Sequence, residues 1–231
     1  SQFTERVHLF PFGVDFEAFD QVRQGRDAIP EELRILSRPV IGYVGGVHQW
    51  VDQEIAASMA ARMPQASIVL VGPPQTDVSR LARCPNIHLL DARPHELVPN
   101  YLKGFDVGVI AYRLSEYTAH VYPTKLNEYL AMGLPVVATD LPEIRRFNAE
   151  HGDIVTVART AEEFLAEVRR ALEPAAPGQL ERRIAVARQN SWSARIAQMS
   201  VLIEAQLAAR RATAVSWEAS LRRLYRTARR R

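Results

Sequence analysis

Short apolar runs rich in β-branched residues alternate with helical patterns along most of this chain, and this alternation constrains the fold more than any other feature. The predicted strands are Pro39–Val44, Ser67–Val71, Ile87–Leu90, Val107–Ala111, Leu134–Ala138 and Asp153–Val157. The helical patterns between them cover Asp52–Met63, Val78–Arg83, Glu96–Leu102 and Thr124–Met132. Strands that alternate with helices indicate βαβ units and a parallel sheet. Because crossovers are right-handed, we expect an α/β fold with a Rossmann-like, doubly wound parallel sheet.

Further helices follow the last predicted strand. The patterns indicate an amphipathic helix at Thr160–Arg170, a linker at Pro174–Gly178, and helices at Gln179–Gln189 and Ser193–Arg211. We therefore predict a Rossmann-like domain with extra C-terminal helices over residues 1–210, and a separate basic tail helix over residues 211–231.

Positive charge is concentrated in this tail. The chain of 231 residues has a net charge of +3, yet eight of its arginines and a single glutamate lie between Arg210 and Arg231. The rest of the chain is net acidic, so we expect no nucleic-acid-binding surface there. On a helical wheel, Trp217, Leu221, Leu224, Tyr225 and Ala228 share one side, and Arg222, Arg223, Arg226, Arg229 and Arg230 share the other. Two interpretations fit Trp217–Arg231 equally: contact with an anionic membrane surface, or docking on a partner domain.

Composition limits the class of protein. With 47% hydrophobic and 24% charged residues, the chain has the make-up of a soluble globular domain. The single cysteine, Cys84, excludes an internal disulfide framework. No apolar run reaches the length of a membrane span, and no signal peptide opens the chain. We expect a cytoplasmic protein, with a peripheral location at the inner face of the membrane if the tail binds lipid.

The segment from Tyr122 to Asp140 carries the strongest functional signal. Pro123 and Thr124 indicate a helix start with Thr124 as its cap, and Lys125 lies in the first turn. A helix N-terminus beside a lysine is a ready site for a phosphate. Glu128, one turn further on, can accept hydrogen bonds from sugar hydroxyls. The segment therefore predicts a site for a nucleoside diphosphate.

Other candidates follow the predicted strands. Gly45 and Gly46 come after the first strand and would let backbone N–H groups approach a phosphate, although they do not form a G-x-G-x-x-G fingerprint. Gly72 and Arg93 follow the second and third strands, where a nucleobase edge could bind. Each of these positions alone is equally or better explained as an ordinary turn, and His48 as a surface or cap residue.

No metal site is predicted. The histidines are scattered and lack H-E-x-x-H spacing, and the chain has neither a G-x-S-x-G elbow nor a Walker sequence. Cys84 precedes Pro85 without a suitable basic cluster, so we interpret it as a buried structural thiol.

Three ordered motifs resemble a known family. The motifs lie at Pro11–Phe19, Ile41–Trp50 and Tyr122–Asp140. Together they are similar to the donor-binding half of GT-B glycosyltransferases, and most similar to the bacterial GT4-like group that includes teichuronic-acid biosynthesis enzymes. The resemblance covers Val7 to about Gln206. It implies half of a GT-B fold, with an N-terminal acceptor domain that is absent from this chain or supplied by a separate subunit.

The resemblance also implies roles for individual residues. Glu128 matches the second carboxylate of the family's E-x7-E motif, which holds the ribose hydroxyls. Backbone groups of Tyr122, Pro123 and Thr124 would face the diphosphate with Lys125, and Gly45 and Gly46 would face the phosphate and sugar. Two departures stand out. His120 replaces the first carboxylate, with Glu116 as a candidate substitute, and the usual basic pair is absent, leaving Lys125 and candidates His48 and Arg93.

Together these implications describe a retaining, metal-independent glycosyltransferase domain that needs no cofactor. Its donor would be a nucleoside-diphosphate sugar, with UDP favoured, and its pathway bacterial surface polysaccharide or glycoconjugate synthesis. We expect the isolated domain to be inactive in sugar transfer. The alternative is a non-catalytic Rossmann-like module whose tail binds a membrane surface or a partner protein.

Overall fold

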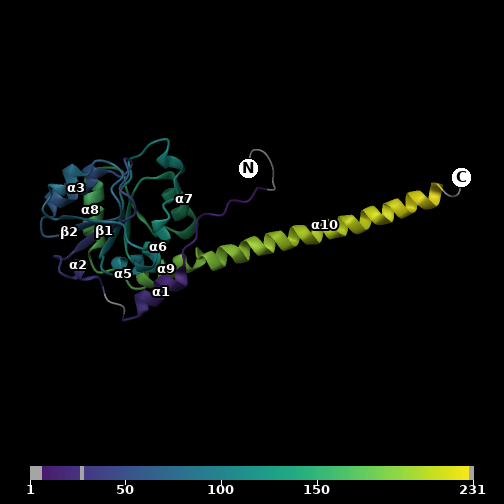
Figure 1. Ribbon diagram of the computed structural model, residues 1–231, viewed down its shortest axis with the longest axis horizontal. Coiled ribbons are helices and arrows are strands. Elements are labelled where there is room, and N and C mark those ends of the chain that lie inside the picture. Colours follow the sequence, from purple (N-terminus) through teal and green to yellow (C-terminus); the bar gives the residue numbers. More distant parts are fainter. Residues whose placement is uncertain (1–6, 27–28, 229–231) are drawn as a thin grey trace. The chain divides into compact units, whose positions relative to one another are not determined.

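The fold is built around a fully parallel six-stranded sheet (Figure 1). The computed structural model describes residues 7–26 and 29–228; within the last helix it describes side chains as far as residue 211 and at residues 221–222. The strand order is β3-β2-β1-β4-β5-β6, which is the doubly wound order of the Rossmann fold. The strands are β1 (Val40–Val44), β2 (Ser67–Val71), β3 (Ile87–Leu90), β4 (Val107–Ile110), β5 (Val136–Thr139) and β6 (Thr156–Ala158).

Helices cover both faces of the sheet (Figure 1). On one face α3 (Gln53–Arg62) packs against α8 (Ala161–Ala171), with α4 (Ser79–Ala82) beside α3. On the other face α6 (Lys125–Ala131) packs against α9 (Gln179–Gln189) and α1 (Phe16–Gln24), and α1 packs against α5 (Val98–Lys103). Strands β1, β2, β4 and β5 are buried along their whole length, as continuous apolar runs in a covered parallel sheet should be.

The predicted sheet is confirmed. β2 and β3 begin and end at the predicted residues, and each of the other strands differs from its predicted bounds by one to three residues at one end or at both. Three helices were not predicted: α1, α2 (Glu31–Arg34) and α7 (Pro142–His151). Two 3-10 turns, η1 (His95–Leu97) and η2 (Thr118–His120), complete the elements.

Two glycine loops meet at the carboxyl edge of the sheet. The Gly45 N–H donates to the Val71 carbonyl at 2.8 Å, and the Val47 N–H donates to the Pro73 carbonyl at 3.0 Å. Gly45 and Gly72 both have positive φ, +129° and +149°, a conformation that side chains disfavour. The loops after β1 and β2 are therefore locked together at the edge where ligands bind in such folds.

The last helix, α10 (Trp192–Ala228), is continuous over 37 residues. The sequence predicted two helices here, ending at Arg211 and beginning again in the tail. The chain divides into two compact units, the first ending at Trp192 and the second beginning at Ser193. The predicted domain boundary after residue 210 therefore falls inside a continuous helix. The division into a domain over residues 1–210 and a tail helix over residues 211–231 stays a prediction.

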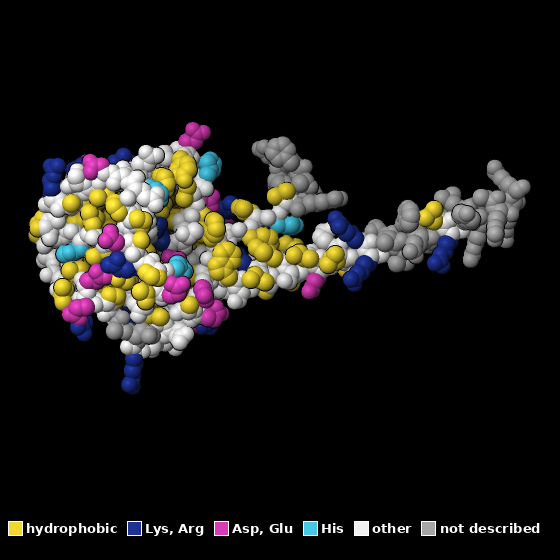
Figure 2. Space-filling view, in the orientation of Figure 1, with side chains coloured by type: hydrophobic (Ala, Val, Ile, Leu, Met, Phe, Trp, Pro, Cys, Tyr) yellow, Lys and Arg dark blue, Asp and Glu magenta, His cyan; other side chains and the backbone are white. Residues whose placement is uncertain are grey.

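Large apolar side chains are exposed along the described first half of α10 (Figure 2). They are Trp192, Ile196, Val201, Ile203 and Leu207. Within the described part of the chain, none of the helices combines the length and apolar character needed to cross a membrane. The wheel predicted for Trp217–Arg231 lies mostly outside the described side chains, and residues 229–231 lie outside the described chain altogether.

Candidate functional site

A cavity of about 250 Å³ opens at the carboxyl edge, between the two glycine loops and the start of α6. Its walls come from the ends of β1 and β2, the loop after β3, η1 and α6. The lining residues are Val44, Gly45, Val71, Gly72, Pro73, Ala92, Arg93, His95, Val98, Thr124, Lys125 and Glu128. Segments far apart in sequence converge here because the carboxyl ends of parallel strands share one edge.

Lys125 supplies a buried cation to this cavity. Its side chain enters the site from α6, and the residue is only 7% exposed. Nζ donates to the Tyr112 hydroxyl at 2.6 Å and lies 4.7 Å and 5.1 Å from the ring centroids of Tyr43 and Tyr112. No carboxylate in the described residues forms an ion pair with it. The charge of Lys125 acts on the Glu128 carboxylate without an ion-pair contact between them. A buried charge that lacks close pairing is costly, so an anion entering the cavity would gain by pairing with it.

The glycine loop lies directly over this ammonium group. A Cβ atom on Gly45 would lie 3.3 Å from both Cε and Nζ of Lys125. The Tyr43 hydroxyl donates to the Gly46 carbonyl at 3.0 Å. Burial raises the pKa of Tyr43 far above its usual range, and the neighbouring Tyr112 and Tyr129 add to the effect. Tyr43 therefore stays protonated and holds the loop in place.

The end of β1 is fixed from the other side as well. The Val44 N–H donates to the hydroxyl oxygen of Tyr129 at 2.9 Å in the core. Burial raises the pKa of Tyr129 well above its normal value. Hydrogen bonds with the buried tyrosines Tyr43 and Tyr129 therefore hold the end of β1 and its glycine loop beside Lys125.

Glu128 supplies the carboxylate predicted from the sequence. Its side chain is 17% exposed, and Oε1 lies 3.2 Å from Nε2 of His95. Burial raises the pKa of Glu128, while the hydrogen bond to His95 and the charges of His95 and Lys125 oppose that rise. His95 was not singled out from the sequence, although its place just after Pro94 in the loop following β3 was the available signal.

Arg93 lines the cavity, but its guanidinium group is held by neighbouring elements. Nη2 contacts both carboxylate oxygens of Glu32 at 3.0 and 3.1 Å, and Nε donates to the Tyr101 hydroxyl at 2.6 Å. Hydrogen bonds to Tyr101 and Glu32 raise the pKa of Arg93. Much of its charge is thus offset within the protein, and direct contact with a ligand stays a prediction.

The structure therefore brings together Gly45, Gly72, Arg93, Thr124, Lys125 and Glu128, and leaves the other predicted residues outside the lining of the cavity. Those others are Gly46, His48, His120, Tyr122 and Pro123.

Each of the residues outside the lining has its own surroundings. His48 stacks on Trp50 with ring centroids 3.9 Å apart, and Trp50 in turn contacts Tyr117 at 5.1 Å. His120 is exposed in η2, as is Glu116 just before it. Tyr122 accepts a hydrogen bond from Asn127 Nδ2 at 2.9 Å. Their contact with a sugar donor stays a prediction.

One local prediction was wrong. Thr124 occupies the N-cap position of α6, but its side chain makes no capping hydrogen bond. Its backbone is in the helical region, at φ −54° and ψ −36°, rather than the extended region that a capping side chain requires.

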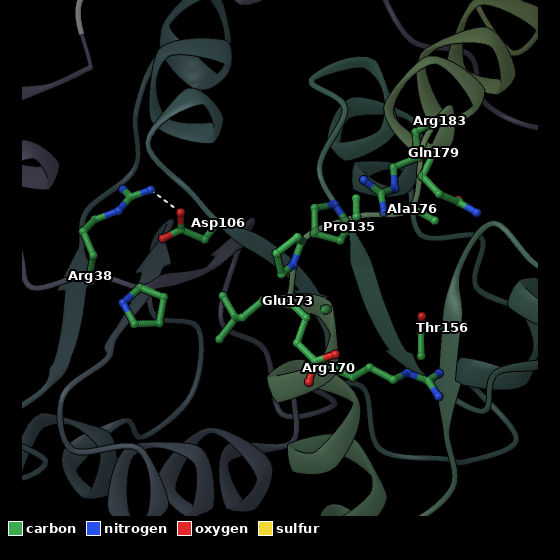
Figure 3. A pocket seen from close by; sticks show the side chains of 14 residues that line it. Arg38, Asp106, Pro135, Thr156, Arg170, Glu173, Ala176, Gln179 and Arg183 are labelled. Carbon is green, nitrogen blue, oxygen red and sulfur yellow. Dashed lines mark hydrogen bonds and ion pairs between the residues drawn. The ribbon is translucent and has the colours of Figure 1, made fainter.

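A larger groove of about 820 Å³ lies at the opposite, amino-terminal edge of the sheet (Figure 3). Arg38 and Asp106 form an ion pair on one side of it, while Arg170, Glu173, Gln179 and Arg183 line the rest. Ligands of open α/β sheets bind at the carboxyl ends of the strands, so the smaller cavity is the better candidate. Within the described residues no group of three or more His, Cys, Asp or Glu side chains is arranged to hold a metal ion.

The sheet order and the helices on both faces define a Rossmann-like domain, with a cavity at the carboxyl edge of its sheet. Residues 38–174 match the family described as Glycosyl transferases group 1, and the chain belongs to this family. Over 142 residues the chain is 35% identical to TuaH of Bacillus subtilis (strain 168), a protein assigned to teichuronic acid biosynthesis as a glycosyltransferase. That match covers 60% of this chain and 35% of TuaH.

Solved structures show the same fold. Sucrose-phosphate synthase (tll1590) from Thermosynechococcus elongatus has a TM-score of 0.68 at 19% identity, covering 87% of this chain and 53% of that one. Anabaena Alr3699/HepE in complex with UDP has a TM-score of 0.66 at 17% identity, covering 84% and 56%. These are GT-B glycosyltransferases, so the predicted Rossmann-like half of a GT-B fold is confirmed. The chain thus spans about half the length of these solved chains and about a third of TuaH.

Proposed function

We propose that the cavity at the carboxyl edge binds the nucleoside diphosphate part of a sugar donor for a glycosyltransferase. The observation that carries this proposal is Lys125, a buried ammonium group that forms no ion-pair contact with a carboxylate of the described residues and lies beneath a glycine loop. Diphosphate is the donor group whose negative charge would complement it. Gly45 and Gly72 leave room for the phosphates to approach the backbone closely.

Glu128 would bind the other end of the nucleotide. Its carboxylate lines the same cavity as Lys125, and an ionised carboxylate is a strong acceptor for the vicinal hydroxyls of ribose. UDP is the favoured nucleotide in this proposal, and the similarity to HepE, whose structure was solved with UDP, supports that choice.

The chemistry proposed is retaining transfer without a metal ion. As the sugar leaves, negative charge develops on the diphosphate, and preorganised N–H groups and a cation stabilise such charge. Lys125 and the backbone of Gly45 and Thr124 would serve here in place of a metal ion. No other cofactor is needed for this step.

Acceptor recognition is assigned to a second domain or subunit. The likeness to TuaH supports a place in the synthesis of a bacterial surface polysaccharide or another glycoconjugate. Recognition of the transferred sugar would involve Gly46, His48 and His120, with Glu116 as the candidate carboxylate.

The basic end of α10 is proposed to contact an anionic membrane surface, which would place the protein at the cytoplasmic face. The support is the sequence pattern of Trp217–Arg231 on a helix whose backbone is described through Ala228. The second candidate function, a non-catalytic module that uses this helix to bind a membrane or partner, is favoured by the exposure of His120 outside the cavity.

Calorimetry with UDP, GDP and ADP tests the donor site. Lys125→Met should weaken binding of the preferred nucleotide roughly 10- to 100-fold, because it removes a charge-assisted contact to phosphate. It should leave the affinity for the matching nucleoside unchanged, and Glu128→Ala should weaken both ligands. Lys103→Met changes the only other lysine and should leave nucleotide affinity unaltered. Absence of binding by all three nucleotides, or equal affinity in the wild type and Lys125→Met, would remove the proposal.

A further inference from the structure

His95 and Glu128 meet in the donor cavity although they belong to different elements. His95 begins η1, after the loop that follows β3, and Glu128 lies in α6. Both line the cavity, and the imidazole Nε2 lies 3.2 Å from Oε1 of the carboxylate. This is the contact that ties the β3 loop to the carboxylate across the cavity.

The two partners differ in burial. The side chain of His95 is 67% exposed, whereas that of Glu128 is 17% exposed. The His95 ring also contacts the ring of Phe19, a buried residue of α1, at a centroid distance of 6.1 Å. The imidazole thus rests against the core on one side and reaches the carboxylate on the other.

The contact with His95 uses the Oε1 atom of the Glu128 carboxylate and leaves the Oε2 atom for a ligand. Among the described residues no protein group forms a hydrogen bond with Oε2. A long glutamate side chain that is held at one oxygen loses less conformational freedom when a ligand binds the other.

We propose that His95 is a positioning residue of the donor site: its imidazole holds the Glu128 carboxylate so that the second oxygen accepts hydrogen bonds from the ribose hydroxyls. This inference rests on the proposed function of the cavity. His95 acts through Glu128 and need not touch the nucleotide itself.

The charges around Glu128 give the proposal a dependence on pH. The groups that face the carboxylate are His95 from η1 and Lys125 from its own helix, with the neutral Tyr129 behind it. Arg93 lines the same cavity but is paired with Glu32. Burial raises the pKa of Glu128, and His95 opposes this rise. Removal of the imidazole should therefore raise the pKa of Glu128 further. As the solution is acidified, Glu128 would then become protonated and lose its charge at a higher pH than in the wild type.

The test compares UDP with 2′,3′-dideoxy-UDP in the wild type and in His95→Phe, which keeps an aromatic ring against Phe19. UDP binding should weaken roughly tenfold, more at acid than at alkaline pH, while binding of the dideoxy nucleotide should not change. His95→Gln, whose amide can still donate near the position of Nε2, should restore most of the affinity. In a Glu128→Gln background, His95→Phe should cause no further loss.

Equal weakening of UDP and its dideoxy analogue, at all pH values, would overturn the proposal, because it would indicate a contact with another part of the nucleotide or a purely structural role. If the wild type does not bind UDP, the comparison is made with GDP or ADP and its dideoxy form, and the proposed function fails only if none of the three nucleotides binds. The positioning contact is then tested by following the Glu128 carboxyl carbon by NMR. A higher titration midpoint in His95→Phe would support the contact, and an identical midpoint would overturn it.

Discussion

Gly72 is the residue on which the architecture of the cavity depends most directly. It has φ of +149°, and a Cβ atom there would lie 2.2 Å from the Gly45 carbonyl oxygen. That atom belongs to the backbone of the other glycine loop, so it cannot swing aside as a side chain would. Only glycine lets the loops after β1 and β2 meet.

Gly72→Ala should therefore damage both stability and ligand binding. Gly178→Ala is the matched control, because Gly178 also has positive φ, +82°, but has open space around its Cβ position. The control should cost about 1–2 kcal/mol of unfolding free energy from backbone strain alone. Gly72→Ala should cost clearly more in urea unfolding and also abolish nucleotide binding. Equal costs in the two variants would contradict this account.

The contacts of the cavity differ in how far the sequence could anticipate them. Lys125 and Glu128 share a short segment, so helix geometry and the resemblance to a family were enough to select them. His95 lies 33 positions from Glu128, and Tyr112 lies 13 from Lys125, so no local pattern joins either pair. The capping role expected for Thr124 was wrong because its own backbone is already helical.

Elements with strong periodic signals were predicted well, and those stabilised by packing were not. α9 begins and ends at the predicted residues. α2 is only four residues long and α1 nine, too short for a clear apolar repeat, and α1 docks on α5 and α6. α7 did carry ordinary signals, with Pro142 in its first turn and Gly152 in the left-handed conformation after it, and these were missed.

The basic end of α10 should bind anionic vesicles. The full chain is expected to sediment with vesicles that contain phosphatidylserine, and a variant lacking residues 215–231 should not. Each arginine near such a surface contributes about 1 kcal/mol, so binding should weaken as salt is raised. Vesicles of phosphatidylcholine alone are the control and should bind little. Unchanged sedimentation of the shortened variant would rule out a membrane role for this end of the helix.

At the scale of the whole molecule, the donor cavity is proposed to be half of an active site. The chain spans 53% of the length of sucrose-phosphate synthase and 56% of that of HepE. We expect it to bind the nucleotide yet transfer no sugar alone, with nucleotide affinity unchanged by a metal chelator. Binding and transfer of a radiolabelled sugar donor, each assayed with and without the chelator, test both expectations. Sugar transfer by this chain alone, or loss of nucleotide binding on chelation, would contradict the corresponding expectation.

The alternation of apolar runs and helical patterns was enough to predict the class of the fold, and the motif at Tyr122–Asp140 pointed to Lys125 and Glu128, which line the cavity. Apolar runs of strand length are a local property, and covered parallel strands require little else to be recognised. Which side chains meet depends instead on how distant segments pack in three dimensions. This packing placed Lys125 between two tyrosines beneath Gly45, tied Glu128 to His95, and engaged Arg93 with Glu32. Those contacts join distant segments at one edge of the sheet. The charge that a ligand would encounter there depends on how these side chains are buried and paired, which their spacing in the sequence does not reveal.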